Sequence, residues 1–330
     1  MVKVKEDLTG REFERLTVIK QVEDYVDPHG NHSARWLCEC GCKEHNQVII
    51  TGEHLKDGTT KSCGCIRKEF LAKIKNKRLG KERYNYQNCL MRIVEYNNNI
   101  DIIIEFQDKY KARVHSTYQA FCDGKIKNPY FPSVCNVGIT GYKYPIKANN
   151  KLTKEYDTWK HMLRRCFDSS HKEKHPEYKD VNCCEEWLLY ENFYEWLHNQ
   201  PNFEKWITGI RWAIDKDILV KGNKIYSPET CCLVPQNVNS LFTKRTKLRG
   251  NLPIGIGFSD NHYRALCKNP FTNKQEKFGY YSTPEDAFYL GYKPYKENII
   301  KQVAQTEFNK GNISRQCYEA MLNYQVEITD

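Results

Sequence analysis

Apolar positions recur along this chain in two spacings, and each spacing predicts a different kind of element. Short runs rich in β-branched or aromatic residues predict strands, and they cover residues 91–96, 100–106, 111–114, 254–258, 263–268 and 276–281. Apolar side chains that return every three or four residues predict helices over 156–167 and 185–197. A turn is expected at 97–99. Thr283 and Pro284 predict a further helix start, because threonine caps a first turn and proline suits its first position.

The segments between these patterns divide the chain into four expected domains. A length of 330 residues can accommodate several separate cores. We expect an α+β, multidomain protein with a small zinc-bound β module at 1–78, a small β module at 79–149, a helical segment ending in a hairpin and helix at 150–243, and a three-stranded sheet with a helix at 244–330. The aromatic residues of the helical segment have core spacing, which favours packing over a base-stacking platform; they are Trp159, Trp187, Tyr190, Phe193 and Trp196.

The net charge indicates the class of binding partner, and the cysteine content indicates the redox state of the compartment in which the protein is expected. The formal net charge of +10 favours a polyanionic partner, such as nucleic acid. No apolar run reaches the ~18 residues of a membrane span, and the first residues do not form a signal peptide. The fifteen cysteines are therefore expected in a reducing cytosol, where clustered cysteines usually bind metal.

Five cysteines gather in the first expected domain, three before residue 43 and two after residue 62. Two Cys-x-Cys pairs can supply four thiolates to one tetrahedral zinc, whose binding would stabilise so short a segment. The predicted ligands are Cys40, Cys42, Cys63 and Cys65, with Cys38 as the substitute and His45 and His54 as less favoured candidates. The alternative is a group of free thiols. The text DLTGREFERLTVI, WLCECGC and LKDGTTKSCGC, within residues 7–66, resembles a zinc-ribbon-like module common in phage-encoded proteins. That resemblance implies a structural zinc and no catalysis.

Asp215-Lys216-Asp217 and the later Asn239 carry the candidate catalytic chemistry. The surrounding text YDTWKHMLRRCF, EEWLLYENFYEW, IDKDI, YSPETC and LVPQNVN, over about 155–242, resembles the HNH segment of phage endonucleases of the homing type. The resemblance implies a hairpin and helix around one divalent ion, Mg²⁺ or Mn²⁺, with Asp215 and Asn239 as ligands. Few protein ligands on a hard cation leave positions open for a phosphate oxygen and the leaving oxygen.

Two positions depart from the family pattern. Lys216 stands where the family has its catalytic histidine, and a lysine is too basic to accept a proton unless it is strongly desolvated, so we expect it to contact phosphate or to stabilise developing negative charge. Thr230 replaces an asparagine that commonly braces the hairpin. Asp217, two residues along a strand, is expected to share a face with Asp215 and to be a second ligand or the substitute base. Three upstream histidines can fold over the hairpin: His161, His171 and His175.

Residues 251–304 contain LPIGI, YRALCK and KFGYYSTPEDAF, and they resemble the three-stranded DNA-binding domain of plant APETALA and ethylene-response factors. The resemblance implies a sheet that enters the major groove and a helix behind it. Arginine can read guanine and lysine can neutralise phosphate. The predicted DNA contacts are Arg264, Lys268 and Lys277 in this sheet, Lys244, Arg245 and Arg249 in the connector before it, and Arg164 and Arg165 in the first helix of the preceding segment. The alternative for the sheet residues is a solvated basic face.

Together these features predict a phage or mobile-element DNA endonuclease that acts on double-stranded DNA in the bacterial cytoplasm. One such site cuts one strand, so nicking is expected unless the protein, a monomer or a homodimer, acts as a pair. A catalytically inactive DNA-binding regulator or interference protein is the main alternative, and Lys216 is its chief support. An RNA-binding or protein-interaction scaffold is a third possibility.

Overall fold

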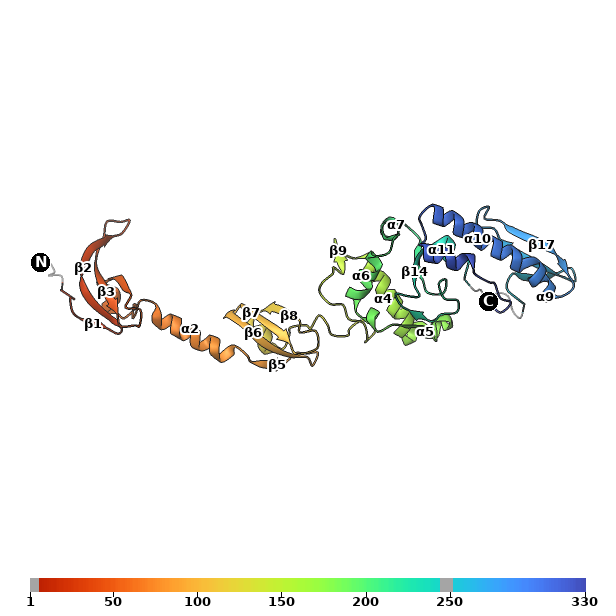
Figure 1. Cartoon of the computed structure of the whole chain (residues 1–330). Coiled ribbons are helices and arrows are strands. Elements are labelled where there is room, and N and C mark those ends of the chain that lie inside the picture. The colour runs from red at the N-terminus through yellow and green to blue at the C-terminus, as the bar shows by residue number, and fades with distance from the viewer. Residues whose placement is uncertain (1–5, 244–251) are drawn as a thin grey trace. The chain divides into compact units, whose positions relative to one another are not determined.

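The computed structural model describes residues 6–243 and 252–330, which form two compact units, Met1–Asn128 and Pro129–Asp330. Figure 1 colours the chain by residue number, with the first unit in red to yellow and the second from green to blue. Helices and several small sheets occur in both units, so the expected α+β class is confirmed in outline. No helix among the described residues is long and apolar enough to cross a membrane.

The first sheet of unit 1 is antiparallel, in the order β1-β2-β3-β4. Its elements are β1 (Glu12–Phe13), β2 (Leu16–Val26), β3 (His32–Cys40) and β4 (Gln47–Thr51), followed by α1 (Gly52–Lys56) and α2 (Cys65–Arg78). Side chains alternate across a strand, so Leu16 and Val18 of β2 face the same side and are buried there with Trp36 of β3. This core is small, and the two cysteine-bearing loops lie at its edge.

A second antiparallel sheet in unit 1 has the order β5-β6-β7-β8 and confirms the three predicted strands. Its elements are β5 (Glu82–Tyr84), β6 (Leu90–Asn98), β7 (Asp101–Phe106) and β8 (Arg113–Ser116), with α3 (Tyr118–Asp123) after them. The turn expected at 97–99 lies later, because β6 continues to Asn98 and pairs there with Asp101. Helix α3 was not predicted, although Thr117 caps it by accepting a hydrogen bond from the backbone N–H of Ala120.

Unit 2 begins with a helical region. Its elements are β9 (Lys147–Ala148), β10 (Lys151–Leu152), α4 (Lys154–Phe167), α5 (Ser169–Lys174), η1 (Pro176–Tyr178), β11 (Asn182–Cys183), η2 (Glu186–Leu188), α6 (Tyr190–His198) and α7 (Phe203–Thr208). The helix predicted over 156–167 is confirmed as α4. The continuous helix predicted over 185–197 is wrong, because Leu189 has an extended backbone and forms a parallel bridge with Ile139. The predicted aromatic core is confirmed, with Trp159, Trp187 and Tyr190 fully buried.

The hairpin region follows with β12 (Trp212–Asp215), β13 (Ile225–Tyr226), β14 (Cys232–Pro235) and the short α8 (Gln236–Asn239). Strand β14 pairs antiparallel with β12, and β13 pairs parallel with β11. Both faces of β14 are buried. Leu233 packs into the core of α4 and α6, whereas Cys232 and Val234 pack into the core of the C-terminal helices. The hairpin is therefore held between two cores of one unit.

The last part of unit 2 is a three-stranded antiparallel sheet backed by helices, as Figure 1 shows for β17 and α10. Its elements are β15 (Ile256–Ser259), β16 (His262–Lys268), β17 (Gln275–Tyr281), α9 (Pro284–Asp286), the π-helical η4 (Ala287–Tyr292), α10 (Lys293–Asn309) and α11 (Arg315–Leu322). Thr283 caps the helix start as predicted, because its hydroxyl accepts from the backbone N–H of Asp286 at 3.1 Å. Val234 and Val238 share the core of α10, so the segments expected as separate domains at 150–243 and 244–330 are packed together.

Candidate functional site

Cys40, Cys42, Cys63 and Cys65 come together at the edge of the first sheet of unit 1. Their sulfur atoms all lie within 4.8 Å of one another, and the pairs Cys40–Cys65 and Cys42–Cys63 are each 3.7 Å apart. A tetrahedral zinc with Zn–S bonds of about 2.3 Å places neighbouring sulfurs about 3.8 Å apart, whereas a disulfide needs about 2 Å. The spacing therefore fits four thiolates around one metal such as zinc.

Backbone hydrogen bonds hold the two cysteine loops in register. The N–H of Gly41 donates to the carbonyl of Arg15 at 2.7 Å, and the N–H of Arg15 donates to the carbonyl of Lys61 at 3.2 Å. One residue of the β1–β2 turn thus ties the loop after β3 to the loop before α2. Gly64, between the second pair of cysteines, has φ of 100°, a conformation that favours glycine.

The thiols differ in their ease of ionisation. Burial raises the pKa of Cys40 to about 11. Burial opposes ionisation of Cys65 as well, but the guanidinium of Arg15 and other hydrogen-bond partners outweigh it and lower the pKa of Cys65 to about 7. Backbone N–H groups of Glu44 and Asn46 lower the pKa of Cys42. Thiolates bind zinc, so these donors favour the form that the metal requires.

The other candidate ligands of this module lie outside the group of four. Cys38 is fully buried in the core of the sheet and is not a member of the cluster. The exposed His45 lies 3.3 Å from Glu39, and the exposed His54 belongs to α1. The position in the strand explains why Cys40 and not Cys38 belongs to the cluster, since Cys38 lies inside β3 whereas Cys40 ends it.

In unit 2, the hairpin and α4 line a groove of about 980 Å³. Asp215, Lys216, Asp217 and Asn239 all line it, although Asn239 is distant from the others in sequence. Helix α4 contributes one face, because its lining residues recur at helical spacing: Lys154, Thr158, His161, Met162 and Arg165. The four predicted catalytic residues are thus gathered around one concave surface.

Asp215 ends β12 and is buried. Its Oδ1 accepts hydrogen bonds from the backbone N–H groups of Asp217 at 2.7 Å and Ile218 at 2.8 Å. Burial raises the pKa of the Asp215 carboxyl, and these two N–H donors only partly offset that effect. Because β12 stops at Asp215, the prediction that Asp217 continues the strand and shares its face is wrong. Asp217 instead follows in a turn closed by the Asp215 carboxylate.

Lys216 is only 8 % exposed, and its ammonium braces the loop that follows. Its Nζ lies 2.7 Å from Oδ1 of Asp217 and donates to the carbonyl of Asn223 at 3.0 Å. The side chain of Asn223 donates back to the carbonyl of Lys216 at 2.9 Å. Thr230 has a similar role, because its hydroxyl donates to the carbonyl of Ile225 at 2.8 Å. Two of the hydrogen bonds of Lys216 are therefore directed at its own loop.

The groove also carries cations and a histidine. Arg165 lines it and donates to the hydroxyl of Tyr226 at 3.4 Å, whereas Arg164 is exposed beside His171 and is not among the lining residues. His161 lines the groove, with Nδ1 3.4 Å from a carboxylate oxygen of Asp157. His171 and His175 are absent from the lining of the described groove and pack on each other with ring centroids 4.5 Å apart.

The segment after α11 closes one side of the groove. Tyr324 lines it and packs edge-on against Phe242 with ring centroids 4.7 Å apart. Lys221 of the hairpin loop holds this segment, donating to the carbonyl of Gln325 at 2.7 Å and to Oδ2 of Asp330 at 2.9 Å. Lys224 of the same loop also lines the groove. The sequence analysis did not select Lys221 or Lys224, although both lie between Asp215 and Thr230 and could have been chosen on that ground. Nothing in the sequence pointed to Tyr324 as a residue of the groove.

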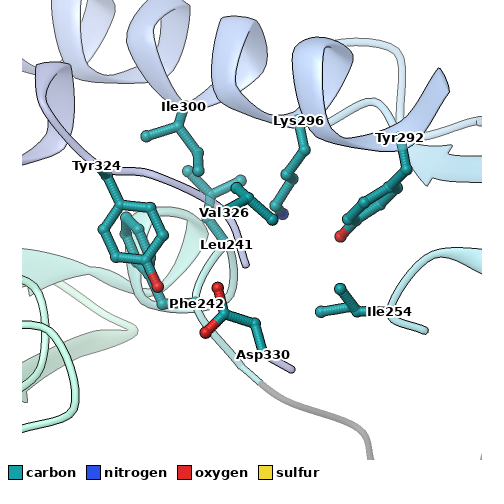
Figure 2. Close-up of a pocket in the computed structure, with 9 residues that line it drawn as sticks. All are labelled: Leu241, Phe242, Ile254, Tyr292, Lys296, Ile300, Tyr324, Val326 and Asp330. Atoms are coloured by element: carbon teal, nitrogen blue, oxygen red, sulfur yellow. The ribbon is translucent and has the colours of Figure 1, made fainter. Parts of the chain in front are cut away.

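Tyr324 and Phe242 also border a second, much smaller cavity, in which Figure 2 shows Lys296 of α10 and Asp330 extending from opposite sides. Burial lowers the pKa of Lys296 there. The cavity measures about 20 Å³, which is room for about one water molecule and not for a nucleotide. The groove is therefore the candidate site for a large ligand.

The three predicted contacts of the C-terminal sheet share its solvent face. Arg264 pairs with Tyr280, and Lys268 with Gln275, while Lys277 pairs with Leu266. Alternation turns these positions away from Ala265 and Cys267, which are buried against η4 and α10. Arg264 is nevertheless only 20 % exposed, and its Nε is buried without a hydrogen-bond partner in the described part of the chain. Lys244, Arg245 and Arg249 lie outside the described residues.

Comparison of the chain with protein-family models, curated proteins and solved structures finds no match.

Proposed function

We propose that this protein is a metal-dependent DNA endonuclease of the HNH type that nicks double-stranded DNA. The observation that carries the proposal is the groove of unit 2, where Asp215 and Asn239 line one concave surface together with Arg165 and Lys224. A carboxylate and an amide offer the oxygen ligands that Mg²⁺ and Mn²⁺ prefer, and the cations offer contacts for phosphate. The sequence resemblance to HNH endonucleases supports the same assignment.

The donor set fits a hard cation. Oδ1 of Asp215 is taken by two backbone N–H groups, which fix the carboxyl and leave Oδ2 as the oxygen for a metal. The amide oxygen of Asn239, in the turn of helix that follows β14, would be the second protein ligand. A bound Mg²⁺ would stabilise negative charge on the scissile phosphate and the leaving oxygen. Arg165, which also lines the groove, would hold a non-bridging phosphate oxygen in this proposal.

His161 is our candidate for the general base. Lys216, at the position of the family's histidine, has its ammonium paired with Asp217 and bonded to Asn223, so it is poorly suited to accept a proton. The imidazole of His161 lies in the same groove, and the carboxylate of Asp157 can orient it through Nδ1. His161 would then take a proton from the attacking water, because imidazole is the most common general base in enzymes.

Two other parts of the chain would fix the protein on DNA in this proposal. The four-cysteine module would hold a structural zinc, in the manner of the zinc ribbons that it resembles. The solvent face of the C-terminal sheet would contact the major groove through Arg264, Lys268 and Lys277. Both assignments predict binding that weakens steeply with salt.

A plasmid assay tests the catalytic proposal. The purified chain is incubated with supercoiled phage or plasmid DNA and Mg²⁺ or Mn²⁺, and open-circular product is measured for the wild type and for Asp215→Asn. Asparagine keeps the shape and the Oδ1 acceptor of Asp215 but removes the charge. We expect metal-dependent nicking by the wild type and none by the variant. Equal nicking by both, or none by the wild type with any metal while it binds the same DNA tightly, would remove the enzyme assignment.

The second candidate is a catalytically inactive DNA-binding regulator, and the engaged ammonium of Lys216 is the observation that favours it. This candidate predicts that Asp215→Ala leaves the protein's effect in a phage-infected cell intact. The nuclease proposal predicts that the effect is lost.

A further inference from the structure

Helix α2 of unit 1 is exposed along its whole length. None of its fourteen residues is buried, and even its largest apolar side chain, Phe70, is 61 % exposed. Most helical stability in proteins comes from packing an apolar face, and a free helix of this length is marginal in water. The helix therefore depends on other supports and presents a bare surface to a partner.

The two ends of α2 are fixed. Its first residue, Cys65, belongs to the four-cysteine cluster, and Glu69 in the next turn forms a bidentate pair with Arg15 at 2.6 and 3.0 Å. At the other end, the guanidinium of Arg78 lies 3.8 Å from the ring centroid of Tyr118 and bonds to the hydroxyl of Tyr96. The surface between these anchors is held in position without being covered.

The exposed surface of α2 is strongly basic, and its lysines form no ion pair within the described residues. The helix carries six cations and one acid, and that acid is Glu69, already paired with Arg15. Within the described residues no ion pair neutralises the four lysines of α2, which are Lys68, Lys73, Lys75 and Lys77. The neighbouring β5–β8 sheet shows the contrast, because its exposed cations Arg92 and Arg113 are paired with Glu82 and Glu105.

We propose that α2 is a DNA-contacting element whose lysines bind the phosphates of a duplex beside the target site. This inference deepens the proposed function and depends on its DNA partner. At about 1.5 Å per residue the helix extends about 21 Å, a distance over which duplex DNA carries about a dozen phosphates. Four unpaired lysines match that dense negative charge.

The arrangement of the lysines favours a nucleic acid over a lipid surface. A membrane-bound helix separates its apolar face from its charged face. In α2, Lys73 and Lys77 follow Phe70 by three and seven residues and so share its face, while Lys68 and Lys75 lie on another face. Lysines on two faces suit a helix that lies along a groove between two phosphate backbones.

The test uses the full-length chain and a four-site variant, Lys68→Gln, Lys73→Gln, Lys75→Gln and Lys77→Gln. Glutamine has a helix propensity close to that of lysine. The matched control makes the same change at four exposed lysines of the β5–β8 region: Lys109, Lys111, Lys125 and Lys127. Binding to a labelled DNA duplex of about 30 base pairs is measured without added Mg²⁺, between about 50 and 200 mM KCl. Circular dichroism and zinc content check that both variants are folded.

Each lost phosphate contact lowers the slope of log K against log salt by about 0.9, so we expect the α2 variant to lose about 2 to 4 in slope and at least about tenfold in affinity. The control should bind like the wild type. Equal binding by the two variants would overturn the role of α2 and leave the proposed function intact. Absence of any duplex binding by the wild type, or stronger binding to RNA or to anionic vesicles, would overturn the DNA partner itself.

Discussion

Loss of a single cluster thiolate should unfold the first sheet of unit 1 and nothing else. The perturbation is Cys63→Ser, which removes one of four sulfurs spaced for a tetrahedral metal. Structural zinc binding contributes about 10–16 kcal/mol in comparable small modules, so one ligand of four accounts for roughly 2.5–4 kcal/mol if the four contribute equally. Among the described residues the local core has eight buried side chains, against nineteen in the core around α10, and it cannot compensate for that loss.

Hydrogen–deuterium exchange of the full-length chain, read by mass spectrometry, measures this effect region by region. We expect amides of β2 and β3 to lose their protection in Cys63→Ser or after chelation, while β14 and α10 keep theirs. Cys122→Ser is the matched control, because Cys122 is a half-buried cysteine of the same unit outside the cluster. A purified wild type with no metal at the cluster, or unchanged protection of β2 and β3 after chelation, would contradict the claim that a bound metal stabilises this sheet.

Three further predictions concern unit 2. Burial raises the pKa of Asp215 in the metal-free protein, so its charged form is lost at a higher pH than that of an ordinary carboxyl; the affinity for Mn²⁺, which binds the carboxylate form, should therefore weaken as pH falls, and a Mn²⁺ titration at several pH values measures it. In metal-free buffer the same shift makes the folded state bind the extra proton, so its stability should decline as pH rises from the unfolded pKa through the folded one, and thermal unfolding of Asp215→Asn should lack that decline. His161→Gln should lower the single-turnover nicking rate about 10²- to 10⁴-fold with little change in DNA affinity, and an unchanged rate would exclude it as the base. Arg264→Ala should cost about 1–3 kcal/mol of binding and relax the choice of one base, whereas Lys277→Gln should weaken all duplexes alike and reduce the salt slope by about 1; a binding-site selection experiment separates the two.

The sequence predicted elements well where local chemistry decides them. The three strands of the C-terminal sheet lie close to the short apolar runs that predicted them, and Thr283 and Pro284 mark a helix start that the structure confirms. The four clustered cysteines could also be predicted, since two Cys-x-Cys pairs in a short chain segment leave few other sets of four thiolates for one metal. Only the structure excludes Cys38 as a metal ligand. Cys38 and Cys40 lie in the same strand, β3, and Cys40 ends that strand whereas Cys38 lies two residues before its end.

Features set by distant contacts could not be predicted. The break at Leu189 results from its bridge to Ile139, which interrupts an otherwise helical pattern. The turn at Asp217 is local by contrast: Oδ1 of Asp215 accepts from the backbone N–H groups of Asp217 and Ile218, which the spacing of the two aspartates alone did not indicate. Tyr324 lines the groove through contacts that are distant in sequence, namely its packing on Phe242 and the hydrogen bond from Lys221 to the carbonyl of Gln325.

The most direct test of the catalytic centre is the binding of Mn²⁺ to the zinc-loaded protein, followed by electron paramagnetic resonance. The account predicts one Mn²⁺ site per chain in the wild type, and its loss in both Asp215→Asn and Asn239→Ala, with the zinc content unchanged. If both variants bound Mn²⁺ as the wild type does, the two side chains would not share an ion and the nuclease assignment would fail.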